Sequence, residues 1–232
     1  DLHSFPTRRS SDLVGDGAQS APHMPVEVQK MDADFFAFSG HKLLAPLGIG
    51  VLYGKQGLLE DMPPFITGGE MIEYVTREST TFAELPHKFE GGTVNAAGAV
   101  GLDAAISYLH RVGFDFIREQ EEYLTQVLLE DLAELPYVTV YGSEKPEEHC
   151  GIVTFNLEGC HPHDVSSLLD TDHVCIRAGH HCAQPLLQYM KVNATARASM
   201  YFYNTVEEVH RFTQSLAKVR EELGYGSETN LS

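Results

Sequence analysis

The segment Ser39-Gly-His-Lys42 places an amine where it could do chemistry, because it directly follows the apolar run 35–38. A lysine in this position is expected to point into a site, and a lysine held away from water becomes an amine able to form a Schiff base. Ser39 and His41 could donate hydrogen bonds to a phosphate. A surface lysine in a turn is the alternative explanation.

Asp16-Gly-Ala-Gln19 follows a second short segment, Val14-Gly15, which is expected to end a buried strand. A carboxylate at the end of a buried strand is costly unless a cation lies beside it. The ring nitrogen of pyridoxal phosphate (PLP) is such a cation. An aspartate that caps a helix is the common alternative. The two motifs support each other, because a PLP site needs both a ring-nitrogen carboxylate and a lysine such as Lys42.

A third motif, Arg177-Ala-Gly-His-His-Cys182, surrounds a thiol with basic side chains. Gly179 permits a sharp turn, and electropositive surroundings favour the thiolate form of a cysteine. The alternative is a metal site, but a His-His-Cys triplet has poor geometry for one ion and no fourth ligand is evident. We therefore predict a nucleophile at Cys182 and no metal. The remaining cysteines are expected to be inert; they are Cys150, Cys160 and Cys175.

Arg197 lies in the run Ala194-Thr-Ala-Arg-Ala-Ser199, which otherwise has the composition of a strand. An arginine is an unsuitable core filler, and its planar guanidinium binds carboxylates in a bidentate manner. An amino-acid substrate would supply that carboxylate. A structural ion pair is the alternative.

Strands and helices alternate along the chain, which predicts an α/β fold. The strands are expected over residues 14–16, 34–39, 50–53, 138–141, 152–157, 174–177 and 195–203. The helices are expected over residues 96–111, 114–135 and 164–169, and a last helix begins after Thr205, with Glu208 in the capping-box position. Residues 63–90 are predicted to be a long polar loop.

Composition excludes several classes of function. The 232 residues carry a formal net charge of -17, which disfavours binding to nucleic acid. No apolar run approaches the ~20 residues of a membrane span, and no signal-peptide core is present at the start. The four cysteines match neither a zinc motif nor a disulfide framework. Reduced thiols and a cytoplasmic location are therefore expected.

Together these motifs resemble the Suf-type (group II) cysteine desulfurases, which are fold-type I PLP enzymes. The resemblance runs from about residue 14 to about residue 224 and includes the segment Glu90-Gly-Gly-Thr-Val-Asn95. The motif Gly-His-His-Cys that ends at Cys182 resembles group II more than group I. The resemblance implies conversion of L-cysteine to L-alanine, with the sulfur held as a persulfide on Cys182 and passed to an acceptor protein for iron–sulfur cluster assembly.

The resemblance also assigns roles to single residues. Lys42 would carry PLP, Asp16 would pair with its ring nitrogen, and Gln19 would bond its ring oxygen. Ser39 and His41 would hold the phosphate, and Thr93 would reach the phosphate of the partner subunit. Arg197 would bind the substrate carboxylate, assisted by Arg177 and His181. His163, in His161-Pro-His-Asp164, would contact the zinc of a Suf-system acceptor, although the same segment could simply cap a helix.

The family's chains have roughly 400 residues, so the resemblance implies that this chain is a C-terminal part. We expect a foreign or disordered segment at 1–13, the end of a large PLP-binding domain at 14–113, a small α/β domain at 114–226 and a tail at 227–232. A homodimer is also expected. The sequence leaves three alternative functions open. One is a selenocysteine lyase, one is a metal- or sulfur-carrier module built on the histidines and Cys182, and one is an inactive truncated product.

Overall fold

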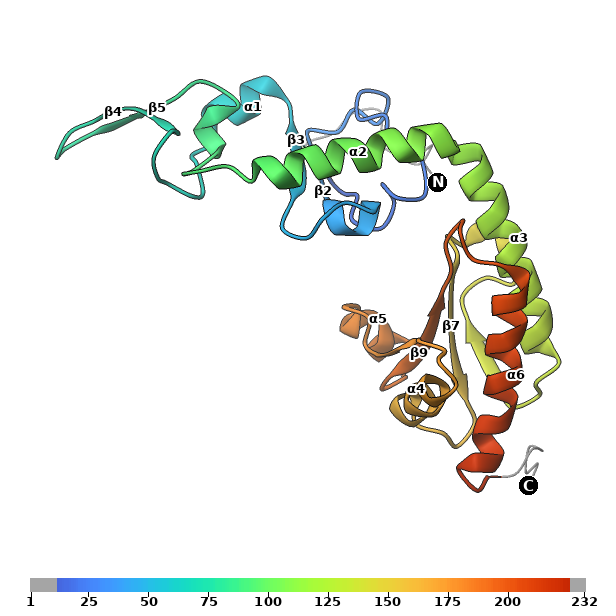
Figure 1. Cartoon of the computed structure of the whole chain (residues 1–232). Coiled ribbons are helices and arrows are strands. Elements are labelled where there is room, and N and C mark those ends of the chain that lie inside the picture. The colour runs from blue at the N-terminus through green and yellow to red at the C-terminus, as the bar shows by residue number, and fades with distance from the viewer. Residues whose placement is uncertain (1–11, 226–232) are drawn as a thin grey trace. The chain divides into compact units, whose positions relative to one another are not determined.

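The structure is a computed structural model and describes residues 12–225 (Figure 1). The expected foreign segment 1–13 and the tail 227–232 lie almost wholly outside these residues. The chain divides into two compact units, an N-terminal unit of residues 1–114 and a C-terminal unit of residues 115–232. No helix of the described part is both long and apolar enough to cross a membrane.

The N-terminal unit contains a three-stranded sheet in the order β1-β2-β3, formed by Val14–Asp16, Phe35–Ser39 and Gly50–Gly54. β1 is parallel to β2, and β3 is antiparallel to it. The last two strands match their predicted ranges to within one residue. β1 was expected to be buried, and that expectation is wrong because Val14 is 68% exposed. Within the described residues β1 pairs only with β2, so it is an edge strand.

Ion pairs and a hydrogen bond connect the strands of this small sheet to the segments beside them. The Lys55 Nζ lies 2.7 Å from carboxylate oxygens of both Asp32 and Asp34. The second oxygen of Asp34 accepts a hydrogen bond from the backbone N–H of Leu13 at 2.7 Å. These carboxylates raise the pKa of Lys55, chiefly through their hydrogen bonds. The ends of β2 and β3 are therefore tied to the segment that leads into β1.

The remainder of this unit contains two elements that the sequence reading did not predict. A short helix, α1 (Gln56–Asp61), follows β3, and a hairpin of β4 (Ile72–Val75) and β5 (Thr80–Phe82) lies within the predicted loop. The Thr76 side chain closes this hairpin by accepting hydrogen bonds from the N–H groups of Glu78 and Ser79. The predicted helix over 96–111 is confirmed as α2 (Ala96–Val112).

The C-terminal unit contains a four-stranded antiparallel sheet in the order β6-β7-β9-β8. Its strands are β6 (Val138–Tyr141), β7 (Ile152–Leu157), β8 (Arg177–Gly179) and β9 (Thr195–Ser199). Its helices are α3 (Phe114–Ala133), α4 (Pro162–Thr171), α5 (Gln184–Tyr189) and α6 (Val206–Glu222). The α/β class and most of these elements match the sequence-based prediction.

One face of this sheet forms the core. Val153, Phe155 and Leu157 alternate along β7, and all three are buried with Ala196 and Ala198 of β9. Apolar residues of α3, α4 and α6 pack against them, including Leu128, Leu169 and Leu216. Because side chains alternate across a strand, Thr154 and Arg197 face away from this core. The sheet thus has one apolar face and one polar face.

Two predicted strands differ from the structure. The strand expected over 174–177 begins only at Arg177, since the Val174 N–H donates to Leu169 O at the end of α4 rather than to a neighbouring strand. The strand expected over 195–203 ends at Ser199. Its continuation becomes a turn in which Tyr201 and Asn204 exchange hydrogen bonds, one of them through the Asn204 side chain.

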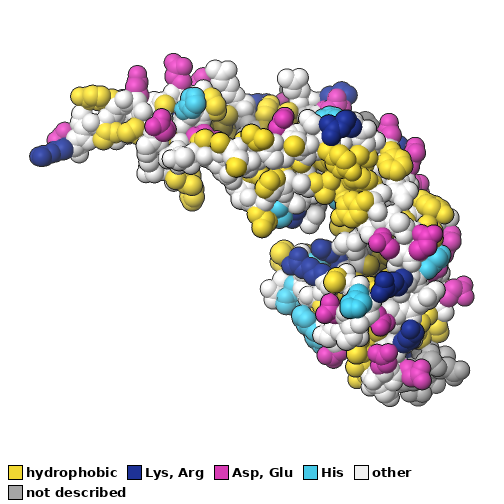
Figure 2. Space-filling view, in the orientation of Figure 1, with side chains coloured by type: hydrophobic (Ala, Val, Ile, Leu, Met, Phe, Trp, Pro, Cys, Tyr) yellow, Lys and Arg dark blue, Asp and Glu magenta, His cyan; other side chains and the backbone are white. Residues whose placement is uncertain are grey.

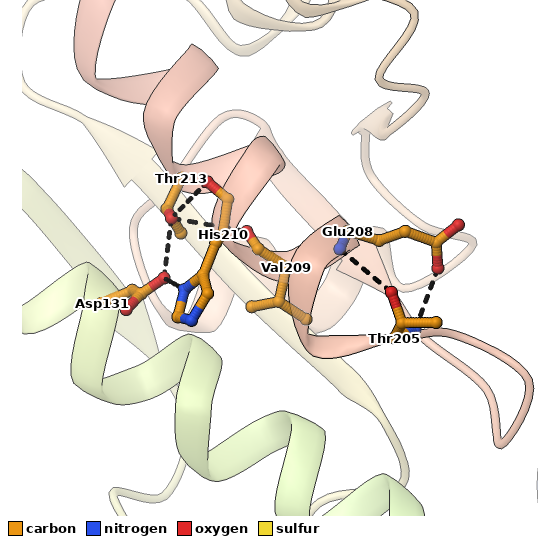
Figure 3. Close-up of polar contacts among 6 residues, drawn as sticks. All are labelled: Asp131, Thr205, Glu208, Val209, His210 and Thr213. Carbon is orange, nitrogen blue, oxygen red and sulfur yellow. Dashed lines mark hydrogen bonds and ion pairs between the residues drawn. The ribbon is translucent and has the colours of Figure 1, made fainter.

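The last helix begins with the predicted capping box (Figure 3). The Thr205 hydroxyl accepts a hydrogen bond from the Glu208 N–H, and the Glu208 carboxylate accepts one from the Thr205 N–H. One turn further on, Asp131 of α3 accepts hydrogen bonds from His210 and Thr213 of α6 at 2.8 and 2.7 Å. These contacts fix the start of α6 and its position against α3.

The substitution Thr205→Ala is expected to lower the free energy of unfolding by about 1 kcal/mol, because it removes the capping hydroxyl. Urea titration of wild type, Thr205→Ala, Glu208→Ala and the double variant measures this loss. The double variant should lose less than the sum of the singles, since the two caps are reciprocal. Glu221→Ala, at the far end of the same helix, is the control, and an equal loss there would contradict the prediction.

Candidate active site

In the N-terminal unit the candidate cofactor residues lie at the carboxyl ends of two neighbouring parallel strands. Asp16 ends β1 and Ser39 ends β2, and Asp16 is in register with Ala37. The chain remains close to β2 just after β1, because the Gly17 N–H donates to Ala37 O at 2.7 Å. The Asp16 carboxylate is exposed and accepts a hydrogen bond from the Ala18 N–H at 2.9 Å. That bond belongs to a local turn, so the alternative of a helix cap does not apply.

Lys42 lies in the 3-10 helix η1 (Gly40–Leu43), which follows β2 without a linker. Gly40 makes this turn possible, because a Cβ there would lie 2.9 Å from Ile49 O. The Gly40 N–H donates to that same oxygen, and Leu44 closes the turn at φ 63. Lys42 was expected to be shielded from water, but it is exposed, as is His41. Within the described residues the Lys42 amine has no hydrogen-bond or ion-pair partner.

Gln19 and Thr93 are also exposed. Gln19 lies in the turn after β1, near the end of the sheet that carries Asp16. Thr93 lies on a different segment, just before Asn95, which caps α2 by accepting from the Gly98 N–H at 2.9 Å. The structure therefore gathers Asp16, Gln19 and the turn of Lys42 on adjoining segments, and it places Thr93 elsewhere in the unit.

This donor set fits the chemistry of PLP. The carboxylate and the hydroxyl end β1 and β2, and the imidazole and the amine follow β2 directly. Ligands of α/β proteins bind at the carboxyl ends of strands. The amine suits an aldehyde, the carboxylate suits a pyridinium, and the hydroxyl and imidazole suit a phosphate. Asp16, His41 and Lys42 are all exposed, so each side chain is accessible to such a cofactor.

In the C-terminal unit, two arginines lie directly opposite each other. Arg177 of β8 pairs in register with Arg197 of β9, so both side chains leave the same face of the sheet. Like charges in this position repel. The pKa of Arg197 is lowered by burial first and by Arg177 second, while Cys182 opposes the shift. The Arg197 Nε donates to Ser199 Oγ at 3.1 Å. Figure 2 shows basic and histidine side chains gathered over this part of the unit.

Cys182 lies beside this pair. The Arg177 Nη2 is 3.7 Å from the Cys182 sulfur, and the cysteine is exposed. A guanidinium next to sulfur and a free path to solvent are the conditions of a reactive thiol. The alternative of a metal site gains no support, because the described residues contain no cluster of three or more metal-binding side chains.

His181 contacts the protein itself. Its Nε2 lies 2.9 Å from both the carbonyl oxygen and the hydroxyl of Thr195, which is fully buried. Burial is the main cause of a lowered pKa at His181. The bond to Thr195 opposes that shift, and Arg197, Arg177 and His180 add to it.

His163 lies in the first turn of α4, where it is exposed. Its ring stacks on that of His161 at 5.5 Å between centroids. The ring of His161 also caps the helix, because its Nδ1 accepts from the His163 N–H at 3.3 Å. The capping alternative therefore describes His161, while the His163 ring stays available to a partner.

Sequence reasoning missed three residues on the polar face of the sheet. Thr154 is in register with Arg197, so a row of Thr154, Arg197 and Arg177 crosses three strands. Asn156 donates to Ala194 O at 3.0 Å, and its own buried oxygen has no partner among the described residues. Thr195 supports His181. The period-two spacing from Arg197 to Thr195, and likewise from Thr154 to Asn156, was the available signal.

Cys175 was expected to be inert. It is exposed, and its sulfur lies 3.7 Å from an Asp170 oxygen. Cys150 and Cys160 differ from it, since burial raises the pKa of both thiols.

We expect iodoacetamide to modify Cys175 and Cys182 at least about tenfold faster than Cys150 and Cys160 in the folded chain, because exposure and thiolate fraction set the rate. A raised pKa leaves less thiolate at any pH below it. Peptide mass spectrometry over a time course measures all four rates together. Denaturant should bring the rates together, and equal rates without denaturant would contradict the prediction.

The chain is similar to known proteins along nearly its whole length. The "Probable cysteine desulfurase" of Halalkalibacterium halodurans is 52% identical over 218 residues, which are 94% of this chain and 53% of that protein. The apo structure of a cysteine desulfurase from Thermococcus onnurineus NA1 superposes with a TM-score of 0.85 at 44% identity, over 92% of this chain and 52% of that one.

A second solved structure is the cysteine desulfurase CsdA, in its S-sulfonic acid form, from Escherichia coli. It has a TM-score of 0.85 at 38% identity, and the match covers 91% of this chain and 52% of that one. This chain thus spans about half the length of the relatives it matches. The family profile named Aminotransferase class-V matches residues 8–212. The expected α/β fold is confirmed, and the chain belongs to the aminotransferase class-V family.

Proposed function

We propose that the protein is a PLP-dependent cysteine desulfurase that converts L-cysteine to L-alanine and holds the sulfur as a persulfide on Cys182. The observation that carries the proposal is the position of Arg177, which faces Arg197 across two strands and contacts the Cys182 sulfur at 3.7 Å. A candidate carboxylate site and a candidate sulfur nucleophile thereby lie next to each other in the C-terminal unit. The names of the relatives support the same reaction.

The two arginines explain why the substrate would be an amino acid. Their mutual repulsion costs free energy unless an anion lies between or beside them. A carboxylate accepts paired hydrogen bonds from a guanidinium, which also fixes its orientation. Binding the carboxylate at Arg197 would leave the substrate side chain free to reach Cys182. The substrate class is therefore an α-amino acid with sulfur on its side chain.

The sulfur step balances without an added oxidant. The Cys182 thiolate forms a bond to the sulfur of the substrate, and the bond between that sulfur and its carbon breaks. The electron pair of the broken bond stays on the carbon, which takes up a proton to give alanine. Cys182 is left as a persulfide. Arg177, next to the Cys182 sulfur, would stabilise the thiolate before the step.

The N-terminal unit would supply the cofactor site. Family members depend on PLP, and when bound it withdraws electrons from the substrate's α-carbon. Lys42 would hold the cofactor and then move the proton at that carbon. Asp16 would pair with the ring nitrogen, Gln19 with the ring oxygen, and the Ser39 and His41 side chains with the phosphate.

The partners belong to the same proposal. A homodimer, in which Thr93 reaches the partner's phosphate, agrees with the apolar side chains exposed on the N-terminal unit. Examples are Leu47 at 82%, Phe65 at 97% and Val100 at 71% exposure, and Figure 2 shows such side chains over α2. A Suf-system protein would accept the sulfur, with exposed His163 at the contact. Four free thiols agree with a cytoplasmic location.

With added PLP the chain should show a visible absorbance band that Lys42→Ala removes, because the band requires the Schiff base to that amine. Lys30→Ala is the control, since Lys30 is exposed and paired only with Glu27 among the described residues. Cys182→Ser should keep the band and lose persulfide formation. A band that survives Lys42→Ala would refute the assignment of Lys42.

Arg197→Lys should raise KM for cysteine about tenfold, because a lysine keeps the charge and loses the bidentate geometry worth about 1–3 kcal/mol. The value of kcat should change less, since the carboxylate is bound both before and during the reaction. Alanine release measured against cysteine concentration gives both constants. Arg118→Lys, on the exposed surface of α3, should change neither. A fall in kcat alone would contradict a carboxylate role.

A further inference from the structure

The loop that carries Cys182 has an unusual backbone. His181 and Cys182 are consecutive, neither is glycine, and they have φ values of 53 and 61. This left-handed region is unfavourable for residues with a Cβ, and such residues persist only where their surroundings hold them. Gly179, at φ 131, provides the turn into the loop, and the Ala183 N–H donates back to His180 O at 2.9 Å. A single local hydrogen bond between residues 180 and 183 is a weak restraint for two residues with strained backbones.

The His181 ring supplies a second restraint. Its Nε2 lies 2.9 Å from the Thr195 carbonyl oxygen, which only accepts hydrogen bonds, so Nε2 carries the proton. The Thr195 hydroxyl lies at the same distance. Thr195 is fully buried and belongs to β9, the strand that also carries Arg197. The loop is therefore linked to β9 through a buried acceptor residue.

The second ring nitrogen of His181 is Nδ1. Nδ1 of His181 is buried and makes no hydrogen bond within the described residues. Burial lowers the pKa of His181, and Arg197, Arg177 and His180 act in the same direction. A neutral ring with its proton on Nε2 is consistent with both facts. The resemblance to cysteine desulfurases implies a substrate-binding role for His181, and the structure adds polar contacts with Thr195.

We propose that His181 is a positioning residue, which holds the strained Cys182 loop against β9 through Thr195 and so keeps the Cys182 sulfur beside Arg177. The importance of this placement for sulfur transfer rests on the proposed function. The placement itself concerns only the C-terminal unit, where Arg177, His181, Cys182, Thr195 and Arg197 all lie.

The test uses three substitutions that separate the anchor from the backbone. A glutamine amide can place its N–H where Nε2 lies, so His181→Gln keeps the bond to Thr195. An asparagine amide reaches only the position of Nδ1, although asparagine tolerates the left-handed region best. His181→Leu removes the bond altogether. The same three substitutions at exposed His180 are matched controls.

The readout is the ratio of the iodoacetamide alkylation rate of Cys182 to that of Cys175, the other exposed thiol of the same molecule. A general loss of stability would speed or slow both thiols, so the ratio isolates the Cys182 loop. We expect the ratio to fall about fivefold or more in His181→Asn and His181→Leu, as the loss of a hydrogen bond to a buried group implies. It should stay within about twofold of wild type in His181→Gln and in all His180 variants.

Two results would overturn the proposal. One is an unchanged ratio in His181→Asn, which would show that left-handed backbone preference alone maintains the loop. The other is an equal fall in His181→Gln and His181→Asn, which would show that the bond to Thr195 is not the anchor. Both polar variants carry the test if His181→Leu does not fold. The assay needs neither cofactor nor substrate, so a failed desulfurase assay would not decide it.

Discussion

The C-terminal unit depends on keeping two guanidinium groups side by side across β8 and β9. Arg177 and Arg197 repel each other, and the fold must offset that cost. β9 does so by lying between two neighbours, with Ala196 and Ala198 buried in the core on its other face. Because side chains alternate along β9, its two faces have different roles. Ala196 and Ala198 hold the strand in the core, and Arg197 presents its charge on the opposite face, where the proposed carboxylate would bind.

Much of this arrangement could be read from the sequence. Apolar periodicity located β2, β7, α2 and α3 closely, because their burial patterns follow the period of each element. The capping box of Thr205 and Glu208 was also readable, since both partners lie within one turn. The residue types at 16, 42, 182 and 197 provide a carboxylate, an amine, a thiol and a guanidinium, which together suggested one enzyme class. Local features of this kind need no knowledge of distant contacts.

Other features depend on pairing that no local pattern records. The bond between His181 and Thr195 joins residues 14 apart, and it exists because Gly179 is in register with Thr195. The late start of β8 reflects competition from the end of α4, which binds the Val174 N–H. The hairpin in residues 72–82 was missed because its strands are short and exposed.

The shortness of β8 has a consequence for the proposed transfer of sulfur from Cys182. This strand has three residues and forms one margin of the four-stranded sheet, so the loop that follows it leaves the fold at its rim. A group attached to Cys182 is thus carried on the perimeter of the unit, with the hydrophobic interior behind it. A bulky recipient could reach that group by approaching from the side, and the core would stay closed while the transfer takes place.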